Sequence, residues 1–307
     1  MHRLAQYLNE KGIDVEKIYT SRLSNPISFL TAIRRLRIRT SEFDIIHAQY
    51  GSGCGYISSF LKGPKILTLR GSDWYGFQTS SLQGFLHSRL AMSLTRLAIK
   101  KHNIVIAVSK RMRNEIQFNY RGIRLEVIPS GINSAIFQPM TREEARSRIG
   151  EANDRSPWVL FSQPSIPLKR AYLAEMAVEC AKRKIPGLKI KILEGRSPEE
   201  VPFWINASNV ILITSTHEGW PNIVKEGLAC NIPFVSTDVS DLHLIADVAP
   251  SCTVTDATPT KLASGILKAI DRGETDSLRQ YAAEFDLSVI GDRLIRLYEE
   301  VIAKRID

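Results

Sequence analysis

The stretch NVILITSTHEGWPNIVKEGLACNIPFVSTDVSD (residues 209–241) determines the fold class of this chain. It contains two short apolar, β-branched runs, NVILITS (209–215) and IPFVSTD (232–238), on either side of a segment with helical spacing. The chain turns through Gly219 and enters the helix at about Pro221, where a proline in the first turn loses no hydrogen bond. Strand, helix and strand in this order predict a parallel βαβ unit.

Apolar runs of the same kind alternate with helical segments over most of the chain. Apolar residues recur at helical spacing in LQGFLHSRLAMSLTRLAIKK (82–101) and LKRAYLAEMAVECAKRK (168–184). Continuous apolar strands separated by helices are typical of parallel sheets that helices cover on both faces. The other predicted strands are FDIIHAQY (43–50), PKILTLR (64–70), NIVIAVS (103–109), LEVIPS (125–130), WVLFSQ (158–163), LKIKILEG (188–195) and SCTVT (251–255).

This alternation predicts two doubly wound α/β domains. The polar segment 138–157 marks their boundary, so we expect the domains at 1–140 and 141–285. The amphipathic segment 286–307 is expected to form a helix that packs back on the first domain. The chain begins inside helix-like sequence, MHRLAQYLNEKG, so either the topology differs from the usual one or the opening strand is missing from this polypeptide.

The composition excludes several classes of protein. Of the 307 residues, 44% are hydrophobic and 24% are charged, which is ordinary globular usage and argues against disorder, collagen and coiled coil. No apolar run approaches the ~18–20 residues of a membrane span, and the N-terminus has no secretory signal pattern. The four cysteines are scattered and form no C-x-x-C pair, so we expect a reduced, cytoplasmic protein without a disulfide framework or zinc site.

The net charge of +9 is unevenly distributed. Residues 1–140 carry 20 Lys and Arg against 8 Asp and Glu, whereas residues 141–307 carry 21 against 24. An asymmetry of this size indicates that the first half meets something anionic. No nucleic-acid recognition motif is present, so an anionic membrane surface and a phosphate-bearing substrate are the candidates, beside the simpler reading of solvated helix faces.

Two carboxylates flank the turn inside the stretch 209–241. Glu218 precedes the helix and Glu226 lies about one turn inside it. Free backbone N–H groups of Trp220, Asn222 and Ile223 would form a phosphate site at the helix N-terminus, above the strand ends where such sheets bind ligands. The two glutamates could bind hydroxyls at both ends of a sugar nucleotide, but spacing alone favours a capped helix with two surface glutamates.

The segment from Glu218 to Glu226, EGWPNIVKE, resembles the E-x7-E signature of the retaining GT-B glycosyltransferases of family 4. The resemblance extends from about Leu4 to the end of the chain. It implies a GT-B fold, in which two Rossmann-like domains face each other across a cleft and the C-terminal helix crosses back to the first. Four further segments resemble motifs of that family in the same order: DIIHAQYGSGCG (44–55), LTLRGSDWYG (67–76), IAVSKRMRNEI (106–116) and VIPSGINSAIFQP (127–139).

The resemblance implies a role for each matching residue on the donor side. Glu226 matches the glutamate that bonds the donor ribose, Glu218 the one facing the sugar near the reacting carbon, and Lys169 the lysine that neutralises the leaving diphosphate. The loop that would hold the diphosphate and hexose, chiefly through backbone amides, comprises Gly219, Trp220, Pro221, Asn222 and Ile223. The nucleobase would lie against Glu194, Gly195 and Arg196.

Two positions depart from the pattern of the family. The glycine and arginine that precede the lysine are replaced by Gln163-Pro164, and Arg170 is expected to substitute for that arginine. Arg70 stands at a catalytic position where many members have histidine. His47 ends a strand and is either a substrate contact or a satisfied core histidine. The residues expected on the acceptor side are His47, Gln49, Tyr50, Gly51 and Asp73.

The resemblance implies a retaining hexosyltransferase that uses a nucleotide-diphosphate sugar, with UDP favoured over GDP, and no metal or other cofactor. The absence of a D-x-D pair agrees with a metal-independent mechanism. The acceptor would be a glycan or a lipid-linked sugar in the synthesis of a surface polysaccharide or glycoconjugate, at the inner face of the membrane.

Two alternatives remain open at this stage. Without its opening strand the chain could be an inactive glycosyltransferase-like binding protein. GSGCG (51–55) and Asp73 also imitate a dinucleotide fingerprint, which would make the chain an NAD(P)-dependent oxidoreductase. That motif needs a third glycine at the position of Tyr56, so the match is weak.

Overall fold

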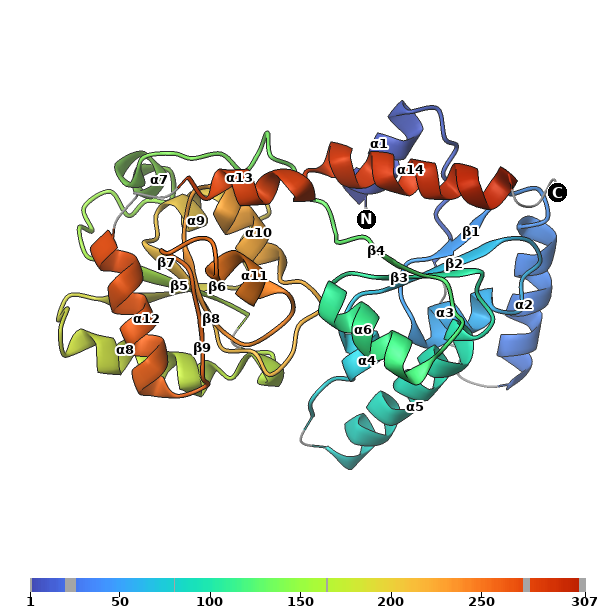
Figure 1. Ribbon diagram of the computed structural model, residues 1–307, viewed down its shortest axis with the longest axis horizontal. Coiled ribbons are helices and arrows are strands. Elements are labelled where there is room, and N and C mark those ends of the chain that lie inside the picture. The colour runs from blue at the N-terminus through green and yellow to red at the C-terminus, as the bar shows by residue number, and fades with distance from the viewer. Residues whose placement is uncertain (1, 20–25, 80, 164, 273–276, 304–307) are drawn as a thin grey trace. The chain divides into compact units, whose positions relative to one another are not determined.

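The computed structural model describes residues 2–19, 26–79, 81–163, 165–272 and 277–303 (Figure 1). The chain divides into two compact units, each an α/β sandwich around a parallel sheet. The first unit comprises Met1–Gly131 and Leu287–Asp307, and the second comprises Ile132–Asp286. The sequence analysis put these boundaries at residues 140 and 285.

The first unit is built on a four-stranded parallel sheet with the strands in sequential order, β1 (Ile46–Ala48), β2 (Lys65–Leu69), β3 (Ile104–Ala107) and β4 (Leu125–Val127). Strand β3 is wholly buried, as expected of a strand covered on both faces. Seven helices surround this sheet among the described residues: α1 (His2–Glu10), α2 (Pro26–Arg39), α3 (Ser52–Ser58), α4 (Ser72–Tyr75), α5 (Leu82–Ile99), α6 (Lys110–Asn119) and α14 (Leu287–Ala303).

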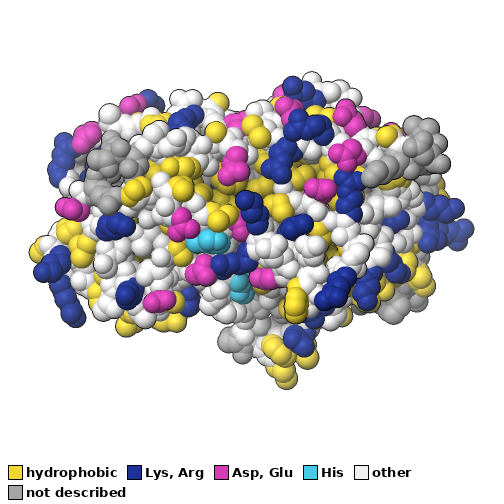
Figure 2. Space-filling view, in the orientation of Figure 1, with side chains coloured by type: hydrophobic (Ala, Val, Ile, Leu, Met, Phe, Trp, Pro, Cys, Tyr) yellow, Lys and Arg dark blue, Asp and Glu magenta, His cyan; other side chains and the backbone are white. Residues whose placement is uncertain are grey.

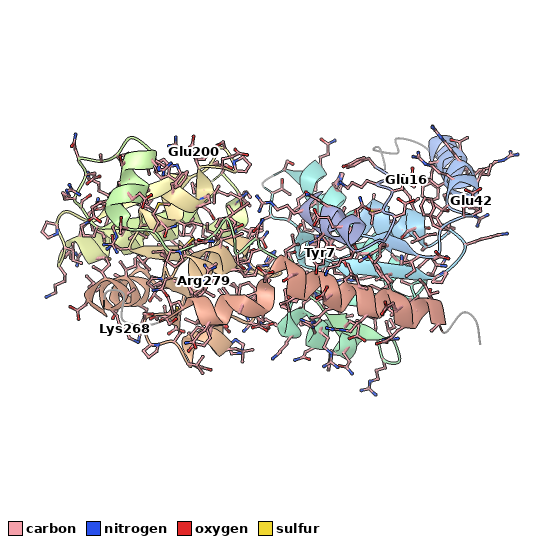
Figure 3. The ribbon with its side chains drawn as sticks, turned by 90° about the horizontal axis from the view of Figure 1, so that it is seen from above. Tyr7, Glu16, Glu42, Glu200, Lys268 and Arg279 are labelled. Atoms are coloured by element: carbon pink, nitrogen blue, oxygen red, sulfur yellow. The ribbon has the colours of Figure 1, made fainter. Side chains whose placement is uncertain are left out.

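The last helix of the chain, α14, belongs to the core of the first unit. Its apolar residues Ile290 and Leu294 pack in one buried cluster with Ile66 of β2 and Ile104 of β3. Helix α14 also lies beside α1, and Figure 3 labels Tyr7 at this contact, where its hydroxyl donates to Asp292 at 2.7 Å. The first unit is therefore completed by a helix that follows the whole of the second unit in the chain.

The second unit is built on a five-stranded parallel sheet with the order β6-β5-β7-β8-β9. The strands are β5 (Trp158–Ser162), β6 (Lys189–Leu193), β7 (Val210–Ile213), β8 (Phe234–Thr237) and β9 (Thr253–Thr255). The helices and 3-10 turns around it are α7 (Arg142–Arg148), η1 (Pro167–Lys169), α8 (Ala171–Lys182), α9 (Val201–Asn206), α10 (Asn222–Ala229), α11 (Leu242–Ala246), α12 (Pro259–Arg272), α13 (Arg279–Ala282) and η2 (Ala283–Phe285).

All nine strands predicted from the sequence are present, and the prediction of an α/β fold with parallel sheets is confirmed. The central strands β5, β7 and β8 are buried along their full length, which is why they read as continuous apolar runs. Helix α10 begins at Asn222, with Pro221 as the residue before the first turn.

The order of the strands reverses at the middle of this second sheet. Strand β6 pairs with one edge of β5, and β7 pairs with the other edge. The chain therefore runs from β5 to β6 in one direction across the sheet and from β6 to β7 in the opposite direction. Parallel α/β sheets bind ligands outside the carboxyl ends of the strands at such a switch point. The loops after β5 and β7 are therefore where a ligand site is expected.

Candidate active site

Two charged side chains from the loops after β5 and β7 meet at this switch point. The Nζ atom of Lys169 donates a hydrogen bond to Oε1 of Glu218 at 2.5 Å. The side chains are only 11% and 15% exposed. The hydroxyl of Ser215 donates to the same carboxylate oxygen at 2.7 Å. An ion pair that is largely removed from water is screened little by salt, and it holds both groups in one geometry.

Backbone and side-chain hydrogen bonds tie the two loops together behind this pair. The hydroxyl of Thr214 donates to the carbonyl of Lys169, and also lies 3.2 Å from the carbonyl of Arg170. The guanidinium of Arg170 donates in return to the carbonyls of Thr214, at 2.5 Å, and Ser215, at 2.9 Å. Arg170 thus braces the loop after β7; its expected role as a substitute phosphate ligand remains a prediction.

The turn between Glu218 and helix α10 is held from outside the helix. The hydroxyl of Ser240 donates to the carbonyl of Gly219 at 2.7 Å. Pro221 has extended dihedral angles and leads directly into the first turn, which begins with Asn222 and Ile223. The first N–H groups of a helix have no partner inside it, and with the helix dipole they favour an anion. The turn thus leads directly into the N-terminus of α10, and its role as a phosphate site remains a prediction.

The side chain of Trp220 points into the second unit. The centre of its ring lies 4.5 Å from the ring centre of Phe285, and both residues are buried. The fully buried Lys225 places its ammonium 5.4 Å from the ring centre of Trp220 and 5.7 Å from that of Phe285. A cation over aromatic faces stabilises this packing and positions the loop. The ring of Trp220 is therefore packed in the interior of the second unit.

The remaining donor-side residues follow the neighbouring strand or lie on α10. Glu226 is half-buried on α10. Glu194 accepts a hydrogen bond from Ser165, which links the loops after β6 and β5. Gly195 adopts a left-handed conformation with φ of 67°, which favours glycine at this turn. Arg196 lies over the ring of Trp204, 4.5 Å from its centre.

A pocket of about 520 Å³ opens at the carboxyl ends of β7, β8 and β9. It adjoins the Lys169–Glu218 pair, because Arg170 and Ser215 form part of its wall. Its lining is mainly polar and includes Thr216, Thr237, Asp238, Thr255 and Asp256. Hydroxyls and carboxylates in this arrangement suit a hydroxyl-rich ligand.

In the first unit, four of the residues expected on the acceptor side or at the catalytic position form one network. Asp73 is fully buried, and its carboxylate accepts from the N–H groups of Gly51 at 2.8 Å and Arg70 at 2.9 Å. Burial raises the pKa of Asp73, and these N–H groups oppose the rise. The Arg70 guanidinium donates to both the carbonyl and the side-chain oxygen of Gln49. The carboxyl ends of β1 and β2 are thereby locked together.

His47 is bonded through both ring nitrogens inside the first unit. Nδ1 lies 2.6 Å from the hydroxyl of Tyr298 on α14, and Nε2 lies 2.7 Å from that of Thr68. Burial, followed by the positive charge of Arg70, lowers the pKa of His47 to about 3. His47 is therefore a neutral histidine that links β1 and β2 to α14. Tyr50 bonds Ser72 at 2.8 Å.

The sequence analysis overlooked the hydroxyl residues that hold these loops. Thr214 and Ser215 are the last two residues of the predicted strand 209–215, and their position at its carboxyl end was the available signal. Ser130 was given only as the end of a predicted strand and as part of a motif, yet its hydroxyl accepts from Arg70 at 2.7 Å. Asp73 and the GSGCG segment do not form a dinucleotide turn, because the Asp73 carboxylate binds backbone N–H groups, including that of Gly51 before α3.

Among the residues that the structure describes, no three His, Cys, Asp or Glu side chains come together in a way that could hold a metal ion. None of the helices formed by these described residues is both long enough and apolar enough to cross a membrane.

The chain matches two protein-family models. Residues 9–135 match Glycosyltransferase Family 4, and residues 166–272 match Glycosyl transferases group 1. The protein named "Putative teichuronic acid biosynthesis glycosyltransferase TuaC" of Bacillus subtilis (strain 168) is 25% identical over 262 residues, which is 76% of this chain and 65% of TuaC. The chain thus spans less than two thirds of the length of that relative.

Solved structures share the fold at low sequence identity. Sucrose-phosphate synthase from Thermosynechococcus elongatus superposes with a TM-score of 0.72 and 16% identity, over 93% of this chain and 81% of that chain. The Anabaena protein HepE in complex with UDP-glucose superposes with a TM-score of 0.71 and 17% identity, over 96% and 88% of the two chains. The TM-scores show that this chain and the two solved structures share one fold.

Proposed function

Because this chain belongs to the family 4 and group 1 glycosyltransferases and has the GT-B fold, we propose that it transfers a hexose from a nucleoside-diphosphate sugar to an acceptor hydroxyl. The observation that carries the proposal is the Lys169–Glu218 pair at the switch point of the second sheet, next to the N-terminus of α10. A cation and a helix N-terminus on one crevice suit a diphosphate.

The donor would lie along the carboxyl edge of the second sheet. Lys169 and the first N–H groups of α10 would neutralise the diphosphate, and Glu226 would accept from the ribose hydroxyls. The loop after β6, with Glu194, Gly195 and Arg196, would meet the nucleobase. We favour UDP, since the structurally similar HepE was solved with UDP-glucose.

We propose a retaining mechanism that needs no metal. The acceptor oxygen would bond to the anomeric carbon on the face from which the diphosphate leaves, while the bond to the leaving oxygen breaks. The acceptor proton would pass to a phosphate oxygen of the departing group. Lys169 and the backbone N–H groups would stabilise the charge that develops there, as donors in an oxyanion hole do. Glu218 would hold Lys169 in place and face the sugar.

The acceptor is proposed to be a glycan or a lipid-linked sugar of a surface polysaccharide. Support comes from the name of the relative TuaC, which refers to teichuronic acid biosynthesis. The excess of basic residues in positions 1–140 supports an acceptor that carries phosphates or lies at an anionic membrane.

Calorimetric titration of the chain with UDP, GDP, ADP and NAD tests the donor site. We expect one nucleoside diphosphate to bind and NAD not to bind. Glu226→Ala should weaken that binding about tenfold, because it removes a hydrogen bond to a charged group worth roughly 1.5 kcal/mol. Glu175→Ala, at an exposed position on α8, is the matched control. Unchanged affinity in Glu226→Ala would show that the ribose contact is misassigned, and binding without turnover would leave a binding protein.

A further inference from the structure

Helix α5 of the first unit carries an exposed apolar face. Five large side chains on this helix have relative exposures between 51% and 75%: Leu82, Phe85, Leu86, Leu90 and Leu97. Successive leucines are four or seven residues apart and Phe85 lies three residues after Leu82, so all five share one side of the helix. The opposite side is buried against the unit through Ser88, Ala91, Thr95, Ala98 and Ile99. Helix α5 therefore anchors itself with one face and presents apolar surface with the other.

Basic residues are interleaved with these apolar side chains. Arg89, Arg96 and Lys100 are exposed and fall on the same side at the same spacing. The helix contains no Asp or Glu in any of its 18 residues. In Figure 2, hydrophobic and basic side chains gather together over the lower end of α5. The exposed side of α5, from Leu82 to Lys100, is called the α5 face below.

The basic surface continues from the end of α5 to the end of α2. The ammonium of Lys101 lies 4.6 Å from the ring centre of Phe60, and Nε of Arg37 donates to the carbonyl of Phe60 at 2.8 Å. Arg34 and Arg35 are also exposed on α2. Positive charge thus extends beyond the α5 face in the half of the chain where basic residues outnumber acidic ones by 20 to 8.

We infer that the α5 face docks on an anionic lipid bilayer, with its leucines and Phe85 in the headgroup and acyl boundary and its basic side chains on the lipid phosphates. Exposed apolar patches mark interaction surfaces, and apolar residues combined with Lys and Arg suit an interfacial helix. A protein interface of similar size would tend to exclude charge from its centre, whereas here Arg89 and Arg96 lie among the exposed leucines of the helix. Long basic side chains can reach the headgroups while their stems lie along apolar surface.

This inference deepens the proposed function and rests on it in one respect only. If the acceptor is lipid-linked, the α5 face would hold the first unit where that acceptor lies. Lipid binding and nucleotide binding are measured separately, so that either can fail while the other stands.

Co-sedimentation of the full chain with vesicles tests the inference. One vesicle is phosphatidylcholine alone and the other is phosphatidylcholine mixed with phosphatidylglycerol. We expect the chain to sediment with the anionic vesicles and not with the neutral ones. The double variant Leu86→Gln/Leu90→Gln should bind the anionic vesicles at least tenfold more weakly, because transfer of a leucine side chain from water is worth about 1.5 kcal/mol or more. Met176→Gln, at an exposed position on α8 of the second unit, is the matched apolar control.

The charge contribution is tested with Arg89→Gln/Arg96→Gln. Each basic side chain near an anionic surface is worth about 1 kcal/mol, so each loss should weaken binding about fivefold, and less at high salt. Arg183→Gln/Lys184→Gln, exposed in the second unit, is the matched control and should bind as the parent chain does. Circular dichroism and the nucleotide titration verify that each variant is folded.

Three outcomes would overturn the inference. Equal sedimentation with neutral and anionic vesicles would remove the role of the basic residues. Binding that survives both α5 variants would assign the lipid surface to another part of the chain. A dimer that dissociates in Leu86→Gln/Leu90→Gln, with no vesicle binding by the parent chain, would make the α5 face a contact between two copies.

Discussion

Replacing Lys169 by methionine removes the cation from a nearly buried ion pair and keeps the length of the side chain. The side chain of Glu218, 15% exposed in the intact pair, would then keep the hydroxyl of Ser215 as a donor but lose its cation. Loss of one partner of a buried pair costs about 3–5 kcal/mol, and we expect the lower end, because both side chains keep some contact with water. For a unit of about 150 residues, ~3 kcal/mol lowers the melting temperature by roughly 6–12 °C.

The reciprocal variant Glu218→Gln and the double variant complete a cycle. The double variant Lys169→Met/Glu218→Gln leaves no unpaired charge, so it should recover most of the loss seen in Lys169→Met. We expect a coupling free energy of about 2 kcal/mol between Lys169 and Glu218. It is measured by urea unfolding followed by tryptophan fluorescence. The tryptophans of the second unit are Trp158, Trp204 and Trp220.

The same cycle separates a structural role from a role in donor binding. Lys169→Met should weaken UDP binding about tenfold or more, because it removes a charge-assisted hydrogen bond. Glu218→Gln should bind free UDP more tightly, since the full charge of Lys169 becomes available to the diphosphate, while its turnover falls. If Lys169→Met unfolds as the parent chain does, or if Glu218→Gln weakens UDP binding as much as Lys169→Met does, the reasoning is refuted.

Two further predictions follow from close contacts and burial. A Cβ on Gly227 of α10 would lie 2.2 Å from Cδ1 of Ile211 on β7, so Gly227→Ala should destabilise the second unit by about 1–3 kcal/mol. Ile211→Val removes that methyl group and should recover part of the loss in the double variant; failure of this rescue in urea unfolding would contradict the packing argument. His102 is buried, with Nδ1 2.7 Å from the carbonyl of Ala98, and burial lowers its pKa to about 4. Since the unfolded chain takes up this proton near pH ~6.5, stability should fall by about 1.4 kcal/mol per pH unit as the pH decreases from there toward 4. His102→Gln should flatten this dependence of the urea midpoint, and an unchanged slope would assign it to other groups.

The strands and the loop between β7 and α10 were predictable because their determinants are local. Strands buried on both faces leave continuous apolar runs such as WVLFSQ (158–163), and the runs predicted in this way all contain strands in the structure. The turn from Glu218 into α10 is likewise contained in a short segment, with a proline before the helix and two carboxylates around it.

The partners of the candidate site residues lie far apart in the chain and could not be read from it. Glu218 was singled out for a sugar, and its contact with Lys169 joins loops that are 49 residues apart. His47 was open to two readings, and only its bonds to Thr68 and Tyr298 favour the structural one. Such pairings depend on which strands become neighbours, and the hydrophobic pattern of a strand does not encode its neighbour.

By itself, the sequence determined the alternation of strands and helices, the parallel sheets and the turn into the helix that begins at Asn222, because periodicity and turn chemistry act over a few residues. Only the tertiary structure decided that β5 lies between β6 and β7, and that α14 completes the core of the first unit. The physical reason is that strand order and helix docking are set by burial between distant segments, whose apolar faces look alike until they are packed.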